Sequence, residues 1–215
     1  LAMTTELPAR QDQMKQRHLR KPMPFWPLML VAIVAATLFT GLTVWWQSRP
    51  QPLPGMFPAP AFEMTTQNGT TISNKDLQGK FWIANFIFTN CAGPCPRMTE
   101  AMASITEAIN SPRVRFISFT VDPKRDLPPV LKMYGNKFGA DHARWLFLTE
   151  PGTSYLSIAA GFKVAAIPAD GSTPILHSEF MFLVDGSGNV RGIYSHADEV
   201  SMKQLVADTG RLLNE

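Results

Sequence analysis

The sequence predicts a mixed α/β domain, in which helices cover a sheet, preceded by one membrane-spanning helix. Three observations predict this. A long uncharged apolar run lies near the N-terminus, strand and helix patterns alternate along the later part of the chain, and the only two cysteines in 215 residues, Cys91 and Cys95, stand where a strand pattern gives way to a helix pattern. A hydrophobic fraction of 45% supplies one full core, and a net charge of +3 is no nucleic-acid signature.

Residues 27–46 form an uncharged run of 20 residues, long enough to cross a bilayer at about 1.5 Å per residue. Tryptophans flank the run at both ends, and five Lys or Arg side chains precede it within the first 21 positions. The positive-inside rule therefore places the basic segment 1–26 in the cytoplasm and the rest of the chain on the other side. A cleaved signal peptide is the alternative, but the apolar run is longer than that of a typical signal, and the cleavage-like Ala59-Pro60-Ala61 lies far beyond it.

Residues 47–61 are rich in proline and are expected to form an extended spacer of about 3.1 Å per residue. The folded extracytoplasmic domain is expected at 62–215. A bacterial inner membrane with the domain in the periplasm is favoured, because the N-terminus mixes acidic with basic residues and lacks an Arg- and Ser-rich transit segment. The mitochondrial inner membrane fits the same topology and is the alternative.

The first element expected in the domain is a hairpin, because residues 62–66 and 70–72 flank Asn68-Gly69, a pair typical of a type I′ turn. Apolar and β-branched runs predict further strands at 81–89, 114–121, 145–148, 180–184 and 190–194. Helices are expected from Pro96, at a first helical turn, to about residue 110, and at 127–138, 152–160 and 199–213.

Alternating strands and helices, followed by a hairpin and a last helix, point to a mixed sheet covered by helices. With a dithiol where the first core strand ends and its helix begins, the expected architecture is thioredoxin-like. Cysteines near a helix N-terminus are expected to favour the thiolate, which is the nucleophile and the metal ligand. A disulfide between cysteines so close in sequence would restrain the unfolded chain little, so the pair indicates chemistry rather than stability.

The cysteine spacing is C-x-x-x-C, one residue longer than the C-x-x-C of thioredoxin-type oxidoreductases, and it leaves room for both sulfurs to face one ion. Two soft thiolates suit Cu(I) or Zn(II), but a third ligand must come from elsewhere. Among the four histidines, His18 lies on the cytoplasmic side, His142 is expected to be solvated or capping, and His196 lies at a helix entry. His177 opens the strand expected beside the cysteine-bearing strand, and its position alone leaves a structural role and a ligand role equally open.

Three further residues near this region have simple explanations. Asp122 ends a strand at the expected active edge, where an Asp-Pro turn explains it better than a supporting role at the site. Met98 and Met102 lie one helical turn apart. Their thioethers could assist Cu(I), but this spacing favours core packing.

Three blocks of sequence resemble the Sco (SenC) family of membrane-anchored copper proteins, and the similarity extends over roughly residues 60–213. The blocks are 89–96 around the cysteines, 119–126, and His177-Ser178 followed by 180–188. They occur in the order and at the spacing typical of the family. One departure is that Ala92 follows the first cysteine, where the family commonly has proline, and Pro94 precedes the second.

The resemblance implies a thioredoxin-like domain that binds one copper ion through Cys91, Cys95 and His177. Two thiolates and an imidazole suit Cu(I), while Cu(II) would want further N or O ligands. It implies a metallochaperone, a thiol reductant or both, rather than an ordinary enzyme, in assembly of the binuclear copper centre of cytochrome c oxidase. The copper-bearing subunit II of the oxidase is the expected partner, together with periplasmic copper chaperones or thiol–disulfide reductants. Metal loading would require the reduced cysteines, so a disulfide and a loaded site exclude one another.

The main alternative is a membrane-tethered thiol–disulfide oxidoreductase without an essential metal, which needs only the redox-active dithiol of Cys91 and Cys95. A peroxiredoxin-like peroxidase is disfavoured, because the Pro-x-x-x-Thr-x-x-Cys pattern is missing around Cys91. A purely structural membrane protein would leave the paired cysteines unexplained.

Overall fold

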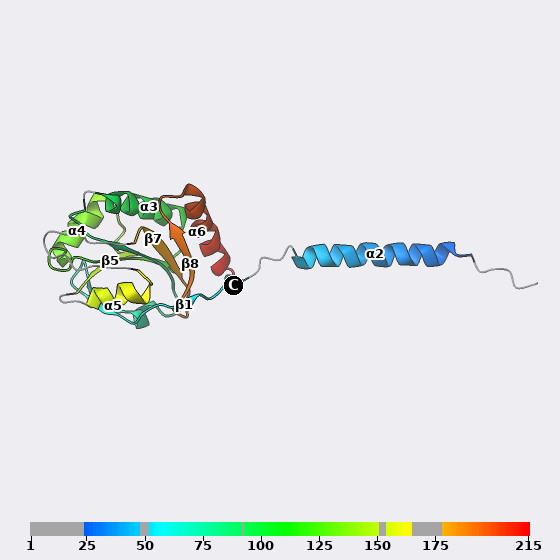
Figure 1. The fold of residues 1–215 in the computed structure, drawn as a ribbon, viewed down its shortest axis with the longest axis horizontal. Coiled ribbons are helices and arrows are strands. Elements are labelled where there is room, and N and C mark those ends of the chain that lie inside the picture. The colour runs from blue at the N-terminus through cyan, green and yellow to red at the C-terminus, as the bar shows by residue number, and fades with distance from the viewer. Residues whose placement is uncertain (1–23, 48–51, 92, 151–153, 165–177) are drawn as a thin grey trace, which may run out of the picture. The chain divides into compact units, whose positions relative to one another are not determined.

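The computed structural model describes residues 24–47, 52–91, 93–150, 154–164 and 178–215. The chain divides into two compact units, Leu1–Pro50 and Gln51–Glu215. In the first unit, the described element is the helix α2, Trp26–Gln47, of 22 residues with a mean hydropathy of 2.2 over its most apolar window (Figure 1). The expected apolar helix is therefore confirmed, and its length and composition suit a membrane span.

The second unit contains an eight-stranded mixed sheet with the strand order β1-β8-β7-β4-β5-β6-β2-β3. Its centre is parallel, because β4 pairs with β5 and β5 with β6 in parallel, whereas the other pairs are antiparallel. The strands are β1 Phe57–Pro58, β2 Glu63–Thr66, β3 Thr71–Ser73, β4 Phe81–Ile87, β5 Val114–Thr120, β6 Trp145–Thr149, β7 Phe180–Val184 and β8 Asn189–Ser195. The predicted mixed sheet is thus confirmed.

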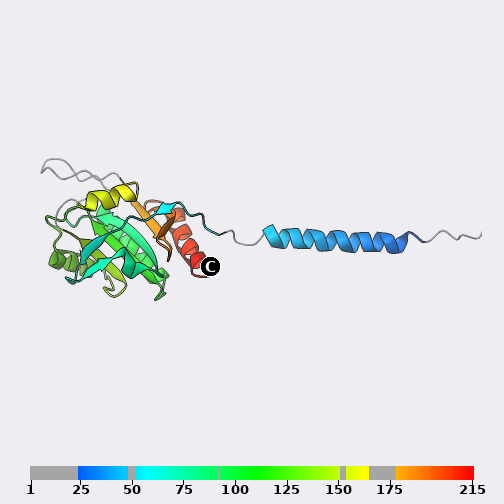
Figure 2. The ribbon, with the colours of Figure 1, turned by 90° about the horizontal axis from the view of Figure 1, so that it is seen from below.

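Helices cover both faces of this sheet. The helical elements are the 3₁₀ turn η2 Asn74–Leu77, α3 Pro94–Ala108, α4 Pro128–Lys137, α5 Ser154–Gly161 and α6 Glu199–Leu212. In Figure 1, α3, α4 and α6 lie on one side of the sheet and α5 on the other. Figure 2 shows α5, in yellow, on its own side from a second direction.

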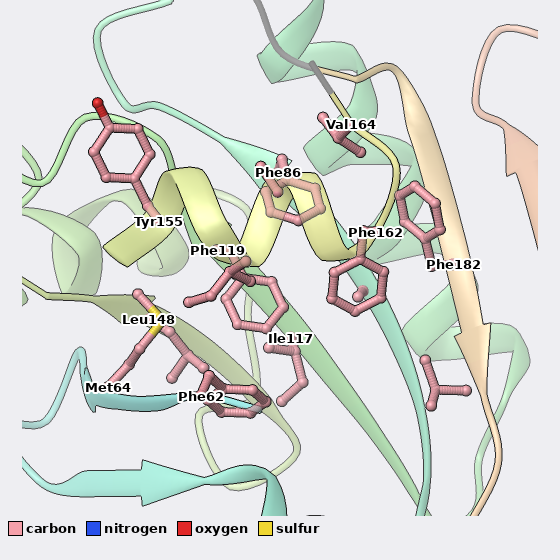
Figure 3. Packing of buried hydrophobic residues seen from close by; sticks show 14 of the residues in the cluster. Phe62, Met64, Phe86, Ile117, Phe119, Leu148, Tyr155, Phe162, Val164 and Phe182 are labelled. Carbon is pink, nitrogen blue, oxygen red and sulfur yellow. The ribbon is translucent and has the colours of Figure 1, made fainter. Parts of the chain in front are cut away.

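Alternation along β4 divides the core into two clusters, because successive side chains of a strand point to opposite faces. Phe86 belongs to the cluster beneath α5, where its ring lies 5.5 Å from that of Phe119 and 5.6 Å from that of Phe162 (Figure 3). Ile83 and Ile87 belong to the cluster beneath α3, α4 and α6. Both ends of the cysteine-bearing strand are therefore held between two layers of buried side chains.

The hairpin β2–β3 forms as predicted, but its turn is different from the expected type I′ turn. Gly69 has a positive φ of 79°, whereas Lys163 is the one non-glycine residue with positive φ among the described residues, so Asn68 is not left-handed. The Thr66 hydroxyl accepts the N–H groups of Asn68 and Thr70 at 3.3 and 3.4 Å and bonds to the Thr70 hydroxyl at 2.8 Å. Side-chain bonding inside a longer loop therefore replaces the strain that a two-residue turn would place on Asn68.

Part of the segment expected as a spacer is fixed to the sheet. β1 pairs with the start of β8, and the flanking Met56 and Ala59 N–H groups donate to Val190 and Gly188 at 2.9 and 2.8 Å. We call residues 53–59 the strap. The compact unit therefore begins before the strand pattern of the sequence does.

Candidate dithiol metal site

The two cysteines lie at the elbow between β4 and α3, as the sequence predicts. α3 begins at Pro94, so Cys95 lies inside its first turn, with prolines on either side of it. This start is earlier than the expected one at Pro96, and proline suits both positions because the first helical N–H groups have no intrahelical partner. Cys91 remains in the loop, where its Sγ accepts the Gly93 N–H at 3.4 Å.

Cys91 and Cys95 are not joined in a disulfide, and their surroundings differ. Cys91 is half-buried, whereas Cys95 is completely buried. The two side chains are close enough to interact through a hydrogen bond. The structure therefore brings together two of the three predicted ligands, and a metal would require both in the reduced form.

Burial reverses the expected ionisation of Cys95. Desolvation raises the pKa of the Cys95 thiol strongly, and the Cys91 side chain and the Asp126 charge raise it further, against a lowering by the Phe88 N–H. The prediction that the helix N-terminus favours a thiolate is thus wrong for Cys95, because the loss of hydration outweighs the helix dipole. A metal at this sulfur must displace its proton.

A buried carboxylate that sequence reasoning missed lies under this elbow. Asp126 is completely buried in the loop between β5 and α4. Its Oδ1 accepts the Thr89 hydroxyl at 2.5 Å, its Oδ2 accepts the Thr120 hydroxyl at 2.5 Å, and the Thr89 N–H donates to Oδ2 at 3.1 Å. Thr89 is two residues before Cys91, so Asp126 ties the exit of β4 to the exit of β5.

Asp122, which the sequence singled out in the same loop, has a different environment. Its carboxylate pairs with the Arg125 guanidinium at 2.8 Å, and its N–H donates to the Thr120 hydroxyl at 3.0 Å. These contacts agree with the turn-forming interpretation of Asp122. The signal that could have identified Asp126 is topological, because the adjacent parallel strands β4 and β5 bring the residues after them to one edge.

Helix α4 approaches the dithiol from the other side. The Thr99 hydroxyl donates to the Cys95 carbonyl at 2.8 Å and bonds to the Tyr134 hydroxyl at 2.9 Å. Burial raises the pKa of Tyr134 to about 12, with smaller contributions from the charges of Cys95, Cys91 and Asp126. The sulfurs, the Asp126 carboxylate and the Tyr134 hydroxyl therefore occupy one neighbourhood.

The methionines of α3 do not extend the site. Met98 and Met102 are completely buried in the core cluster beneath α3, α4 and α6, which confirms the packing interpretation. In the described residues, no group of three or more Cys, His, Asp or Glu side chains is arranged to hold a metal.

The histidines separate clearly. His177 and His18 lie outside the described residues, so the third ligand stays a prediction. The expectation that His142 is solvated or capping is wrong. Its ring bridges Gln67 Nε2 at 2.9 Å and Asn136 Oδ1 at 2.7 Å. His196 does precede a helix, but the N-cap of α6 is Asp198.

The strap and the dithiol lie at opposite ends of the sheet. β8 runs in the same direction as β4, and β1 pairs with the first residues of β8, at the level where β4 begins. Leu53 in the strap is held there through Glu215, Arg191 and Asp185. The cysteines follow the far end of β4.

Known proteins are similar to this chain in sequence and in fold. The family model described as SCO1/SenC matches residues 55–214. A SCO1 protein homolog of Bacillus subtilis (strain 168) is 31% identical over 151 residues, which cover 68% of this chain and 78% of that protein. The similarity first seen in three short blocks thus extends over residues 55–214, most of the second unit.

Solved structures confirm the thioredoxin-like architecture. The structure of BsSco, described with a disulfide switch and as a member of the Sco family of cytochrome c oxidase assembly proteins, is 29% identical, with a TM-score of 0.66 over 77% of this chain and 98% of that one. Bradyrhizobium japonicum ScoI, solved with copper bound, is 24% identical, with a TM-score of 0.62 over 72% of this chain and 99% of that one. At 24% identity, the similarity to Bradyrhizobium japonicum ScoI shows a shared fold.

Proposed function

The chain belongs to the SCO1/SenC family, and from this premise we propose that it is a copper metallochaperone and thiol reductant in assembly of the binuclear copper centre of cytochrome c oxidase. Its copper would be held by Cys91, Cys95 and His177. The description of BsSco as an oxidase assembly protein and the copper in Bradyrhizobium ScoI support the proposal. The copper-bearing subunit II of the oxidase is the proposed partner.

The observation that carries the proposal is the pair of neighbouring thiols, Cys91 and Cys95, at the elbow between β4 and α3. Two thiolates form a soft donor set that suits Cu(I), and the donor chemistry therefore fits the metal. An imidazole would complete a low-coordinate site, and His177 is the histidine of the family-like block before β7. Because the thiols bind copper only when they are reduced, oxidation to a disulfide would release or exclude the metal.

We further propose that α2 anchors the protein in a bacterial inner membrane, with the second unit in the periplasm. The length of the helix and the basic residues before it support this orientation. In that compartment the dithiol would face both an oxidising environment and incoming copper, so a thiol reductant would be needed to keep the site competent.

The experiment that tests the proposal is a Cu(I) titration of the reduced full-length chain in detergent, against a competing chelator. We expect one copper per chain, and we expect Cys91→Ala, Cys95→Ala and His177→Ala each to weaken binding by at least a hundredfold. His142→Ala is the control, because this histidine lies before β6 at the other end of the sheet and should leave copper affinity unchanged. Wild-type affinity in His177→Ala would refute the ligand set.

A second function is favoured by the unequal exposure of the cysteines. The half-buried Cys91 is accessible to attack a partner disulfide, and the buried Cys95 can then displace the partner and form the intramolecular disulfide. In this reaction the partner gains two thiols and this chain loses two. The variant His177→Ala separates the functions, because it should keep disulfide reduction while losing copper; loss of both activities would show that they depend on one site geometry.

A further inference from the structure

Asp126 is a completely buried carboxylate whose hydrogen bonds all fit the ionised form. Both oxygens act as acceptors, and their partners are donors: the Thr89 hydroxyl, the Thr120 hydroxyl and the Thr89 N–H. The two hydroxyl contacts of 2.5 Å have the length of charge-assisted O–H···O⁻ bonds. The same oxygens are thereby engaged, so the carboxylate is not available as a metal ligand in this arrangement.

Stability is a poor reason for a charge at this position. An asparagine could keep the same network, with its carbonyl oxygen accepting the Thr120 hydroxyl and the Thr89 N–H and its amide donating to the Thr89 hydroxyl. Burial raises the pKa of Asp126 even though three hydrogen bonds lower it, so the ionised form is a net cost to the fold. A costly charge where a neutral isostere fits points to a role in the site.

The Asp126 charge acts on the thiol of Cys95. It raises the pKa of the Cys95 thiol. It also raises the pKa of Tyr134, on which the two cysteines act as well. Asp126 is tied to Thr89, two residues before Cys91. Among the described residues, the nearby cation of the same loop, Arg125, pairs with Asp122 and not with Asp126.

We propose that Asp126 supplies a fixed negative charge beneath the dithiol, and that this charge raises the affinity of the copper site for Cu(II) relative to its affinity for Cu(I). Two thiolates and a neutral imidazole leave a net charge of zero with Cu(II) and one net negative charge with Cu(I). A neighbouring carboxylate destabilises the negatively charged site with Cu(I) and leaves the neutral site with Cu(II) nearly unaffected. Asp126 is a positioning residue in this sense, because it acts through the field at the ligands and not by coordination.

This inference rests on the proposed copper site, and the experiment distinguishes the two. Cu(I) and Cu(II) affinities of the full-length chain are measured by competition titration for wild type, Asp126→Asn and Asp122→Asn. Wild type that binds no copper refutes the proposed function. Wild type that binds copper makes the ratio of the two affinities the readout, which a purely structural role of Asp126 would not move.

We expect Asp126→Asn to raise the Cu(I)-to-Cu(II) affinity ratio roughly tenfold. Asp122→Asn is the matched control, because it removes a carboxylate from the same loop that is already neutralised by Arg125, and its ratio should equal that of wild type. Asp126→Glu keeps the charge and should keep the ratio, even if both affinities fall. An unchanged ratio in Asp126→Asn, or a fall in the ratio, overturns the proposal.

A second variant decides the matter if Asp126→Asn does not fold. Leu127 is 52% exposed and directly follows Asp126, so Leu127→Lys adds a positive charge beside the carboxylate without entering the buried network. At low ionic strength the ratio should shift toward Cu(I) by roughly two- to threefold, since an exposed charge is partly screened. No shift, or a shift toward Cu(II), would count against the proposal.

Discussion

Arg191 is the residue on which the attachment of the strap depends most. Its guanidinium donates to the Leu53 carbonyl through Nε at 3.0 Å and through Nη2, and it pairs with Asp185 at 2.9 Å and with Glu215 at 3.2 Å. Glu215 in turn accepts the Leu53 N–H at 3.2 Å. The Arg191 side chain is only 14% exposed, so these interactions are largely protected from water.

Replacing Arg191 with alanine should therefore destabilise the second unit. Hydrogen bonds to charged groups contribute about 1.5–3 kcal/mol each, while the pair with the more exposed Glu215 adds less than about 1 kcal/mol. Asp185 keeps the N–H groups of Ser187 and Asn189, both at 2.9 Å, so its loss of Arg191 is partly compensated. We expect a net loss of about 2–4 kcal/mol, which lowers Tm by roughly 5–15 °C in a domain of this size.

The assay is urea unfolding of the full-length chain in detergent, combined with amide hydrogen exchange. In Arg191→Ala, the Met56 and Ala59 N–H groups, which bond to β8, should exchange faster than the core of β4 and β5. Lys203→Ala is the control, because it breaks only the exposed pair with Glu199 on α6 and should have no measurable effect. A loss below about 1 kcal/mol, or unchanged exchange in the strap, would refute the reasoning.

Four further predictions follow from the core and the dithiol. Ser118→Ala should lower the free energy of unfolding by about 2–4 kcal/mol, because Ser118 donates to Asn85 Oδ1 at 2.7 Å and accepts the Trp145 indole N–H at 2.9 Å. Adding Asn85→Leu should recover part of this loss. Fully additive effects of the two substitutions in urea unfolding would contradict the prediction. Asp126→Asn should be more stable than wild type at neutral pH. Since the pKa of Asp126 is raised in the folded state, the free energy of unfolding of wild type falls as the pH rises through that raised pKa. Unfolding curves at acid pH should therefore show no difference in stability between the variant and wild type. Met98→Leu and Met102→Leu should leave the copper affinity unchanged in the Cu(I) titration and cost less than about 1.5 kcal/mol each, because both side chains are core. Under limiting iodoacetamide, mass spectrometry should find Cys91 alkylated before Cys95, and equal labelling would argue against the unequal burial.

The elements that the sequence predicted well are those whose pattern records burial on both faces. β5 was expected at 114–121 and extends over Val114–Thr120, and β7 was expected at 180–184 and is found there. Their apolar side chains alternate between the two core clusters, so each strand is buried on both faces. β1 could not be predicted in this way, because Phe57-Pro58 has no pattern of its own and becomes a strand only by pairing with the edge of β8.

The residues of the candidate site also differ in whether they could be predicted from the sequence. Cys91 and Cys95 could be identified from residue type and spacing, because the chemistry is carried by two residues that are close in sequence. Asp126 could not, since its role depends on the hydrogen bonds that Thr89 and Thr120 bring from two different strands. The ionisation of the Cys95 thiol was predicted wrongly for a related reason: a helix N-terminus can be recognised in the sequence, whereas the complete burial of this side chain cannot.

The unequal burial of the cysteines and the charge of Asp126 together constrain how the site can exchange metal. In the proposed copper site, the completely buried Cys95 would be less accessible to an incoming ligand than Cys91. Cys91 is half-exposed and sits in a loop, so an incoming ligand from a partner can displace it first. A carboxylate that disfavours the net negative Cu(I) state would then make the reduced ion the one more readily given up, which is the direction that delivery of Cu(I) to a partner requires.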